Sequence, residues 1–194
     1  GIAERFDEHF RTNYSDGPIS FNQDGSFCVV SRNIIIDANP KKFIKSSNHL
    51  ALYYCSKQGD AWQELHPMPC NSNEFNCTHP ALDLTGKKLI FASTMPGGFG
   101  GYDLWSATYE DGHWSEPVNL GPKVNTKNHE VFPSIDGDDL YFSSDRGAFG
   151  QLDIYTFTES ADTVKVLDAP INSDADDFGL ITLNNLDHAY FTSN

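Results

Sequence analysis

Short runs of apolar residues recur along the chain, and polar turn residues separate them. Each run is short and rich in aromatic or β-branched side chains, which is typical of strands. Between two of the runs, Asp136-Gly137 predicts a tight hairpin turn, because glycine accepts positive φ without steric cost. In this stretch the pattern predicts four short strands, near Phe132–Ile135, Leu140–Ser144, Leu152–Thr158 and Val164–Leu167.

The same pattern occurs more than once in the chain. Gly86 precedes Gly137 by 51 residues, and the leucines and phenylalanines that follow them keep this offset. An earlier copy surrounds Gly25, with a polar insertion from Asn33 to Asn48 that we expect to form a long surface loop. A fourth copy begins at Asp176. A period near 50 with four strands per period predicts an all-β fold, a β-propeller with four-stranded blades, of which about three and a half are present.

The expected domain boundaries follow from where the repeat begins. Residues 1–15 are expected to be a linker or the end of a preceding element, and residues 16–194 a partial propeller with blades starting near residues 16, 78, 130 and 176. Each blade needs neighbours to cover its two faces. We therefore expect the chain to be a fragment, with the ring completed by further blades or by another chain.

Several longer motifs extend beyond this general pattern. They are D-G-P-I-S-F-N-Q-D-G at 16–25, M-P-G-G-F-G-G-Y-D-L-W at 95–105, W-S-E-P-V-N-L-G-P-K-V-N-T at 114–126, E-V-F-P-S-I-D-G-D-D-L-Y-F-S-S-D at 130–145 and P-I-N-S-D-A-D-D-F-G at 170–179. With these motifs the chain resembles the TolB-type, WD-repeat-like propellers of OmpA-family envelope proteins. Two departures are Ala51, which replaces the aspartate seen as Asp103 and Asp153, and the cysteines Cys70 and Cys77.

The resemblance implies a place in the cell envelope, in the periplasm or at the periplasmic face of the outer membrane. One branch that the chain is similar to is the periplasmic component that tethers the type IX secretion machinery to peptidoglycan. The partners implied are other envelope or secretion-machinery proteins, with peptidoglycan bound through an OmpA-like domain that this sequence does not show. The implied role is a non-enzymatic scaffold for protein–protein assembly.

The charge of the chain narrows the classes of partner. Asp and Glu number 27 against 13 Lys and Arg, which gives a formal net charge of -14. Nucleic-acid binding takes its affinity from basic side chains that neutralise phosphates, so we expect no nucleic-acid partner. We also expect no direct membrane insertion, because no apolar run approaches the length that spans a bilayer.

The acidic residues give the first candidates for chemistry. Asp103 and Asp153 recur before the third strand of a blade, and we interpret them as structural carboxylates that accept hydrogen bonds from loop amides. The aspartate-rich segments 136–139 and 174–177 lack the pattern of an EF-hand, so weak calcium binding is the most they suggest, and no cofactor is expected. The chain carries no nucleophile elbow or zinc motif, and we expect no enzyme; a glycan-binding or glycan-cleaving propeller is the alternative.

One set of residues is a candidate binding site. The start of each first strand lines the central channel of a propeller, and Asp16, His79, Glu130 and Asp177 stand at or just before these points. Such a ring would focus negative potential and receive a cationic side chain or the tip of a partner loop. The competing interpretation is that these residues only hydrate the mouth of the channel.

The four cysteines allow two pairings. Cys70 and Cys77 bracket a short polar stretch, and a bridge between them would stabilise the chain by roughly 2 to 3 kcal/mol. Cys28 and Cys55 lie in strand-like runs that could be neighbours. The alternative is that all four are buried thiols, since cysteine is among the most buried residue types.

Overall fold

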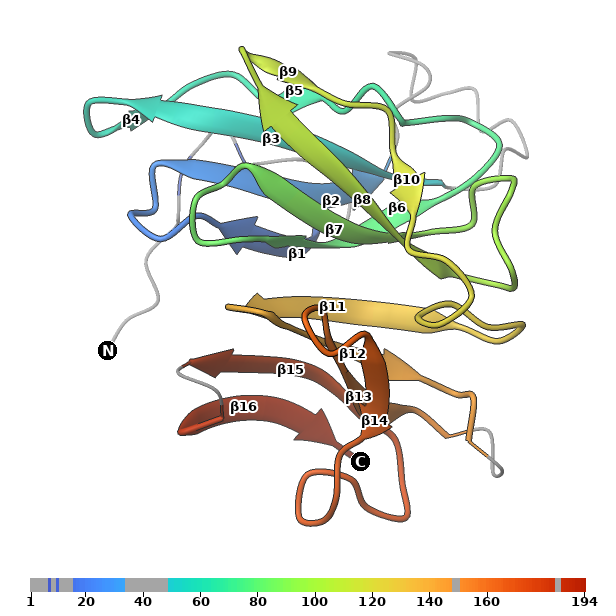
Figure 1. The fold of residues 1–194 in the computed structure, drawn as a ribbon. Coiled ribbons are helices and arrows are strands. Elements are labelled where there is room, and N and C mark those ends of the chain that lie inside the picture. Colours follow the sequence, from blue (N-terminus) through green and yellow to red (C-terminus); the bar gives the residue numbers. More distant parts are fainter. Residues whose placement is uncertain (1–6, 8–9, 11–15, 34–48, 148–150, 184–185) are drawn as a thin grey trace.

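The computed structural model describes residues 7, 10, 16–33, 49–147, 151–183 and 186–194. Every element of this part of the chain is a β-strand, and the strands form four antiparallel sheets that follow one another along the sequence (Figure 1). The all-β prediction is therefore confirmed. Most of the predicted linker 1–15, and residues 34–48 of the predicted insertion loop, lie outside the described residues. No described helix is long and apolar enough to cross a membrane.

The first two sheets each contain three long strands and two very short ones. The first sheet consists of β1 (Asp16–Phe21), β2 (Phe27–Asn33), β3 (Leu50–Gln58), β4 (Ala61–Trp62) and β5 (His66–Pro67). The second consists of β6 (Cys77–Leu82), β7 (Lys88–Ser93), β8 (Asp103–Glu110), β9 (His113–Trp114) and β10 (Val118–Asn119). In both sheets the two short strands pair with the third long strand. These pairs are β4 and β5 with β3, and β9 and β10 with β8.

The third sheet has the four strands that the sequence predicts, and the fourth has two. They are β11 (Glu130–Asp136), β12 (Asp139–Ser144), β13 (Asp153–Thr158) and β14 (Thr163–Val166), then β15 (Asp177–Leu183) and β16 (His188–Ser193). Asp136 pairs with Asp139, so Gly137 and Asp138 form a two-residue hairpin turn, and Gly137 has a φ of 62° as predicted.

The first strands of the sheets lie side by side. β1 contacts β6, β6 contacts β11, and β11 contacts β15. The later strands of each sheet lie outside this row, which is the arrangement of propeller blades around a centre. In the described chain the row is open between its first and last sheets (Figure 1). The exposed cross-strand pair of Ile181 and Tyr190 lies on the fourth sheet, with 64% and 76% of their surfaces accessible.

The second strands of the two middle sheets, β7 and β12, divide their side chains between two neighbouring sheets. In β7, Leu89 and Phe91 pack into the cluster shared with the first sheet, whereas Ile90 and Ala92 pack into the cluster shared with the third. The period-2 alternation of a strand requires this division, because successive side chains point to opposite faces. Every interface between sheets is therefore a hydrophobic core to which two consecutive blades contribute.

The first strand of each sheet also carries an irregularity near its start. The pairing register shifts within the first residues of β1, β6, β11 and β15, as in a β-bulge. In β6 and β11 the residue at the shift, His79 or Phe132, has a φ of 48° or 50°, and Gly179 has 69° in β15. A left-handed backbone is unusual for residues with bulky side chains. The extra residue in each bulge changes the face of the sheet to which the following side chains of that strand point.

Candidate functional site

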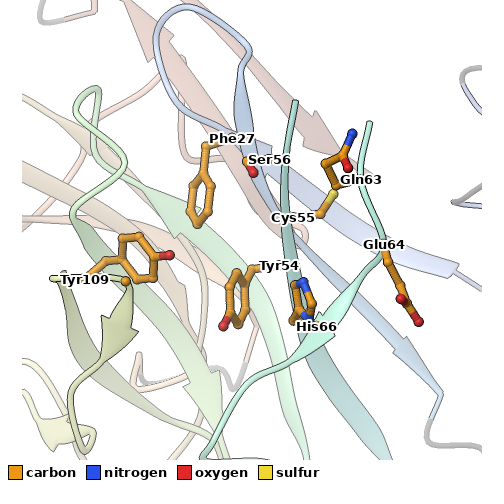
Figure 2. Close-up of a pocket in the computed structure, with 9 residues that line it drawn as sticks. Phe27, Tyr54, Cys55, Ser56, Gln63, Glu64, His66 and Tyr109 are labelled. Carbon is orange, nitrogen blue, oxygen red and sulfur yellow. The ribbon is translucent and has the colours of Figure 1, made fainter. Parts of the chain in front are cut away.

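A pocket lies at the outer rim, between the ends of the first and second sheets. It has a volume of about 250 Å³. Figure 2 shows that its residues come from β2, β3, the segment around β5 and the end of β8. The lining residues are Phe27, Tyr54, Cys55, Ser56, Gln63, Glu64, His66, Tyr109 and Gly112.

Aromatic rings form most of one side of this pocket. The ring centroids of Phe27 and Tyr109 are 5.3 Å apart, and those of Tyr54 and His66 are 5.6 Å apart. The buried Trp114 packs against them, with its ring 5.0 Å from that of Tyr109. Phe27, Tyr54 and Tyr109 are each half-buried, so part of each ring stays accessible from the pocket. The cluster is thus packed into the interface between two blades and also presents a surface.

Polar groups complete the rim pocket. The exposed carboxylate of Glu64 lies on its wall beside the exposed ring of His66. Burial, and then the neighbouring Tyr54, raise the pKa of Tyr109, so its phenol stays protonated and can donate a hydrogen bond. Aromatic faces attract cations, and a carboxylate adds to that attraction. The pocket can therefore hold a cationic or a flat apolar group, with hydrogen bonds at its edge.

The predicted central ring of acidic residues is organised differently from the expectation. Glu130 is completely buried, with its carboxylate oxygens directed at its own sheet and the preceding loop. It accepts bonds from the Thr126 backbone N–H at 2.9 Å, the Thr126 hydroxyl at 2.7 Å and the Ser144 hydroxyl at 2.9 Å. Arg146 forms an ion pair with it at 3.1 Å. In this position Glu130 fastens a loop and does not present its charge to a docking partner.

Asp177 repeats this arrangement in the fourth sheet. It is also completely buried, and it accepts bonds from the Ser173 N–H at 2.6 Å and the Ser173 hydroxyl at 2.9 Å. Burial raises the pKa of this carboxyl, but the hydroxyl of Ser193 and the two donors of Ser173 outweigh it, so the net shift is downward. Both buried carboxylates therefore join the loop before an inner strand to that strand.

His79 does not occupy the same position as these carboxylates. The strand registers align Asp16, Cys77, Glu130 and Asp177, because each lies opposite the penultimate or last residue of its second strand. His79 comes two residues later, at the bulge, and desolvation by burial lowers its pKa to about 4. It is neutral at pH 7 and stacks on Phe132. Of Asp16, the structure gives the backbone pairing with Arg32.

Asp103 accepts hydrogen bonds within the glycine-rich loop. Its buried carboxylate accepts from the N–H groups of Phe99 at 2.6 Å and Gly100 at 3.1 Å, and from the Asn119 side chain at 2.9 Å. Asp103 therefore accepts hydrogen bonds from loop amides, as expected for a structural carboxylate. Asp153 has the corresponding register, and burial, followed by the charge of Asp177, raises its pKa. Residues 148–150 of its own loop lie outside the described chain.

Three asparagines that the sequence analysis did not single out connect the loops to the third strands. Asn125 accepts from the N–H of Leu104 at 2.7 Å and donates to its carbonyl at 2.9 Å. Asn71 forms the same pair of bonds with Leu52, and Asn172 with Ile154. The signal that could have found them is the repeated tripeptide C-N-S, V-N-T and I-N-S that begins at residues 70, 124 and 171.

The described residues contain neither a candidate metal-binding cluster nor a disulfide bond. No group of three or more His, Cys, Asp or Glu side chains in that part of the chain could hold a metal ion. The carboxylate of Asp139 accepts from the Thr158 hydroxyl at 2.6 Å instead. All four cysteines are thiols. Cys28 and Cys55 lie opposite each other on β2 and β3, with their sulfurs 3.6 Å apart.

The comparisons with solved structures identify the architecture. The chain is similar to TolB from Acinetobacter baumannii, with a TM-score of 0.57 and 11% identity over 89% of this chain and 36% of that one. It is also similar to a putative TolB from Agrobacterium tumefaciens, with a TM-score of 0.57 and 16% identity over 84% of this chain and 48% of that one. The described chain has a TolB-like β-propeller fold. It spans less than half the length of either TolB chain.

The same TolB-like fold also occurs in enzymes. A puromycin-hydrolyzing peptidase of Mycobacterium tuberculosis matches with a TM-score of 0.57 and 11% identity over 87% of this chain and 24% of that chain. No family model matches the sequence, and no curated protein matches it at a significant level. At these identities the likeness shows the fold alone.

Proposed function

We propose that the chain is part of a non-enzymatic propeller scaffold that assembles proteins in the cell envelope. The proposed place is the periplasm or the periplasmic face of the outer membrane. Two things support this: the TolB-like fold, and the motifs at residues 95–105 and 114–126 that resemble envelope propellers. The whole protein is proposed to be a peptidoglycan-associated OmpA-family or type IX secretion component, which binds peptidoglycan through another domain.

The observation that carries the proposal is the rim pocket between the first two sheets. Accessible faces of Tyr54 and Tyr109 suit the side chain of a lysine or arginine from a partner protein, and Glu64 adds a carboxylate to the lining of the same pocket. Tyrosine is enriched where proteins bind one another, because it combines a large apolar face with a hydrogen-bonding tip. The net charge of -14 also favours a basic partner segment.

The alternative is glycan binding at the same pocket. Ser56, Gln63 and Glu64 place hydrogen-bonding groups next to aromatic faces, which is the combination that a sugar ring needs. Glycan cleavage has less support, because it requires two carboxyl groups on either side of the scissile bond. Glu64 is the one carboxylate among the residues that line the rim pocket, and Glu130 and Asp177 are buried and bound to loops.

A charge-reversal experiment distinguishes these functions. The full-length protein carrying Glu64→Lys is cross-linked in envelope extract beside the wild type and beside Glu74→Lys, an equally exposed substitution outside the pocket. We expect Glu64→Lys to reduce the recovery of specific protein partners at least fivefold and Glu74→Lys to leave it unchanged. Equal recovery from all three proteins would contradict the scaffold proposal. Loss of binding to soluble glycan fragments in Glu64→Lys, with protein recovery intact, would establish the glycan alternative.

A further inference from the structure

The loops before the second, third and fourth sheets have one design. Each begins with a tripeptide whose central asparagine bonds to both backbone groups of a third-strand residue, as described above for Asn71, Asn125 and Asn172. The residue after each asparagine then caps the loop: Ser72 accepts from the Glu74 N–H at 3.1 Å, and Thr126 accepts from the Asn128 N–H at 3.2 Å. These matching bonds align the starts of the loops, and the first loop has one more residue before its inner strand than the other two.

In this alignment a cysteine replaces the carboxylate that closes the loop. Glu130 lies opposite Ser144 and accepts its hydroxyl, and Cys77 lies opposite Ser93 with its sulfur 3.5 Å from that hydroxyl. Cys77 is buried, as Glu130 is. The thiol cannot accept the two strong bonds that Glu130 takes from Thr126. The loop before the second sheet therefore lacks the set of carboxylate hydrogen bonds, here called the carboxylate clasp, by which Glu130 holds the loop before the third sheet.

The second cysteine of the same loop stands next to this position. Cys70 aligns with the buried Val124, and it packs against the same core cluster that contains Cys77. The sulfur of Cys77 is 4.0 Å from the carbonyl oxygen of Cys70. A hydrogen bond also joins the side chains of Cys70 and Cys77. The two side chains are thus neighbours, and Cys70 is the more exposed of the two.

We propose that Cys70 and Cys77 are a redox-active pair that closes into a disulfide and takes the place of the carboxylate clasp between the first two blades. The oxidant is a disulfide of low molecular weight or of a protein. The thiolate of Cys70, the partly exposed cysteine, attacks one sulfur of the oxidant and releases one thiolate. The thiolate of Cys77 then attacks the sulfur of Cys70 and releases the second. Two protein thiols are oxidised, the external disulfide becomes two thiols, and the protons of both cysteines go to those products.

Cys28 and Cys55 provide an internal comparison. Their sulfurs are 3.6 Å apart, but the two residues are 0% and 1% exposed, within a cluster that includes Trp62. Cys70 is partly exposed at the start of its loop. An oxidant has access to a thiol in proportion to its exposure and its thiolate character. The pair that reacts in the folded chain is therefore Cys70 with Cys77.

The experiment uses the folded full chain in oxidised glutathione or in dithiothreitol. After each treatment the thiols are alkylated under denaturing conditions and mapped by peptide mass spectrometry. We expect oxidation to remove the alkylation of Cys70 and Cys77 and to leave Cys28 and Cys55 alkylated. The melting temperature should rise by about 5 to 10 °C, as expected when a short loop is closed in a domain of this size.

Cys70→Val is the matched variant, because valine is the residue that stands at this place in the next loop. Its melting temperature should be the same in both treatments. Full alkylation of Cys70 and Cys77 after oxidation would overturn the proposal. So would glutathione that stays attached to Cys70 without closure, or a bridge that forms first between Cys28 and Cys55. The mapping of the wild-type chain decides between these outcomes even if the variant does not fold.

Discussion

The imidazole of His79 stacks on the ring of Phe132, with the ring centroids 3.9 Å apart and the planes inclined by 21°. Both residues occupy the bulge of an inner strand, one blade apart, and the backbone N–H of Phe132 points at Nδ1 of His79 at 3.4 Å. The hydrogen bond requires a neutral imidazole, since Nδ1 must keep its lone pair to accept the bond from Phe132.

The stack predicts a specific loss of stability in mild acid. Burial lowers the pKa of His79 from 6.5 to about 4 in the folded chain, so between these values the unfolded chain binds the extra proton. Stability should therefore fall as the pH drops from 6.5 to 4, by on the order of 1 to 3 kcal/mol for this residue. The half-buried position favours the lower end of that range.

The measurement for His79 is urea unfolding at several pH values. His79→Phe keeps a ring at the bulge, as Phe132 does, and removes the titrating group. The difference in unfolding free energy between wild type and variant should change between pH 6.5 and 4 and be constant above pH 7. A difference that is flat across the whole range would show that His79 titrates as it does in the unfolded chain.

The buried ion pair of Glu130 and Arg146 predicts a large effect of removing one partner. Glu130→Ala leaves Arg146, which is 16% exposed at its side chain, without its carboxylate and leaves the donors of Thr126 unbonded. We expect a loss of about 3 to 5 kcal/mol in unfolding free energy. The exposed pair of Lys88 and Glu159 is the control, and Glu159→Ala should cost less than about 1 kcal/mol. Equal losses in the two variants would contradict a clasp at Glu130.

The glycine-rich loop predicts a steric effect at Gly100. A β-carbon there would lie 2.4 Å from the carbonyl oxygen of Thr126 and 2.5 Å from that of Asn128, and both are backbone atoms that cannot rotate away. Gly100→Ala should lower the unfolding free energy by about 2 to 3 kcal/mol. Phe99→Ala changes the neighbouring side chain, which is 49% exposed, and should cost less than about 1 kcal/mol. Thermal unfolding of both variants beside the wild type measures the two losses. A stable Gly100→Ala variant would mean that the two loops separate easily.

The paired hydrogen bonds of the loop asparagines predict additive losses of unfolding free energy. Asn71→Ala and Asn172→Ala each leave one N–H and one carbonyl group of a third strand without their partner, which should cost about 2 to 4 kcal/mol. The loops of these two residues belong to sheets that are not adjacent. The double variant should therefore lose the sum of the single losses within about 0.5 kcal/mol. Strong non-additivity, measured by chemical denaturation, would reveal coupling across the intervening blade.

The repeat could be predicted from the sequence because its signals are local. The turn at Asp136-Gly137 and the alternation in Leu140–Ser144 depend only on neighbouring residues, and the strands form where they were expected. The direction in which the side chains of Glu130 and Asp177 point could not be predicted from neighbouring residues. Their burial depends on a loop hydroxyl four residues earlier and on a serine across the hairpin, and these meet only after the blade has folded.

The same limit explains the two other differences. His79 was grouped with the acidic residues because the bulge, which shifts the register after Thr78, leaves no clear mark in the sequence. The rim pocket was not found at all. Phe27, Tyr54 and Tyr109 come from three strands in two sheets, and no spacing along the chain relates them.

The division of side chains along the middle strands has a consequence for how such a protein changes length in evolution. A sheet such as the second has no interior of its own, because half of its apolar side chains belong to the interface on either side. A deletion that removes part of a blade leaves one neighbour facing water. A duplication or loss of one whole repeat joins faces that already match, and stability then changes by one nearest-neighbour contribution. Viable relatives should accordingly differ in steps of complete blades, with insertions confined to the connecting loops.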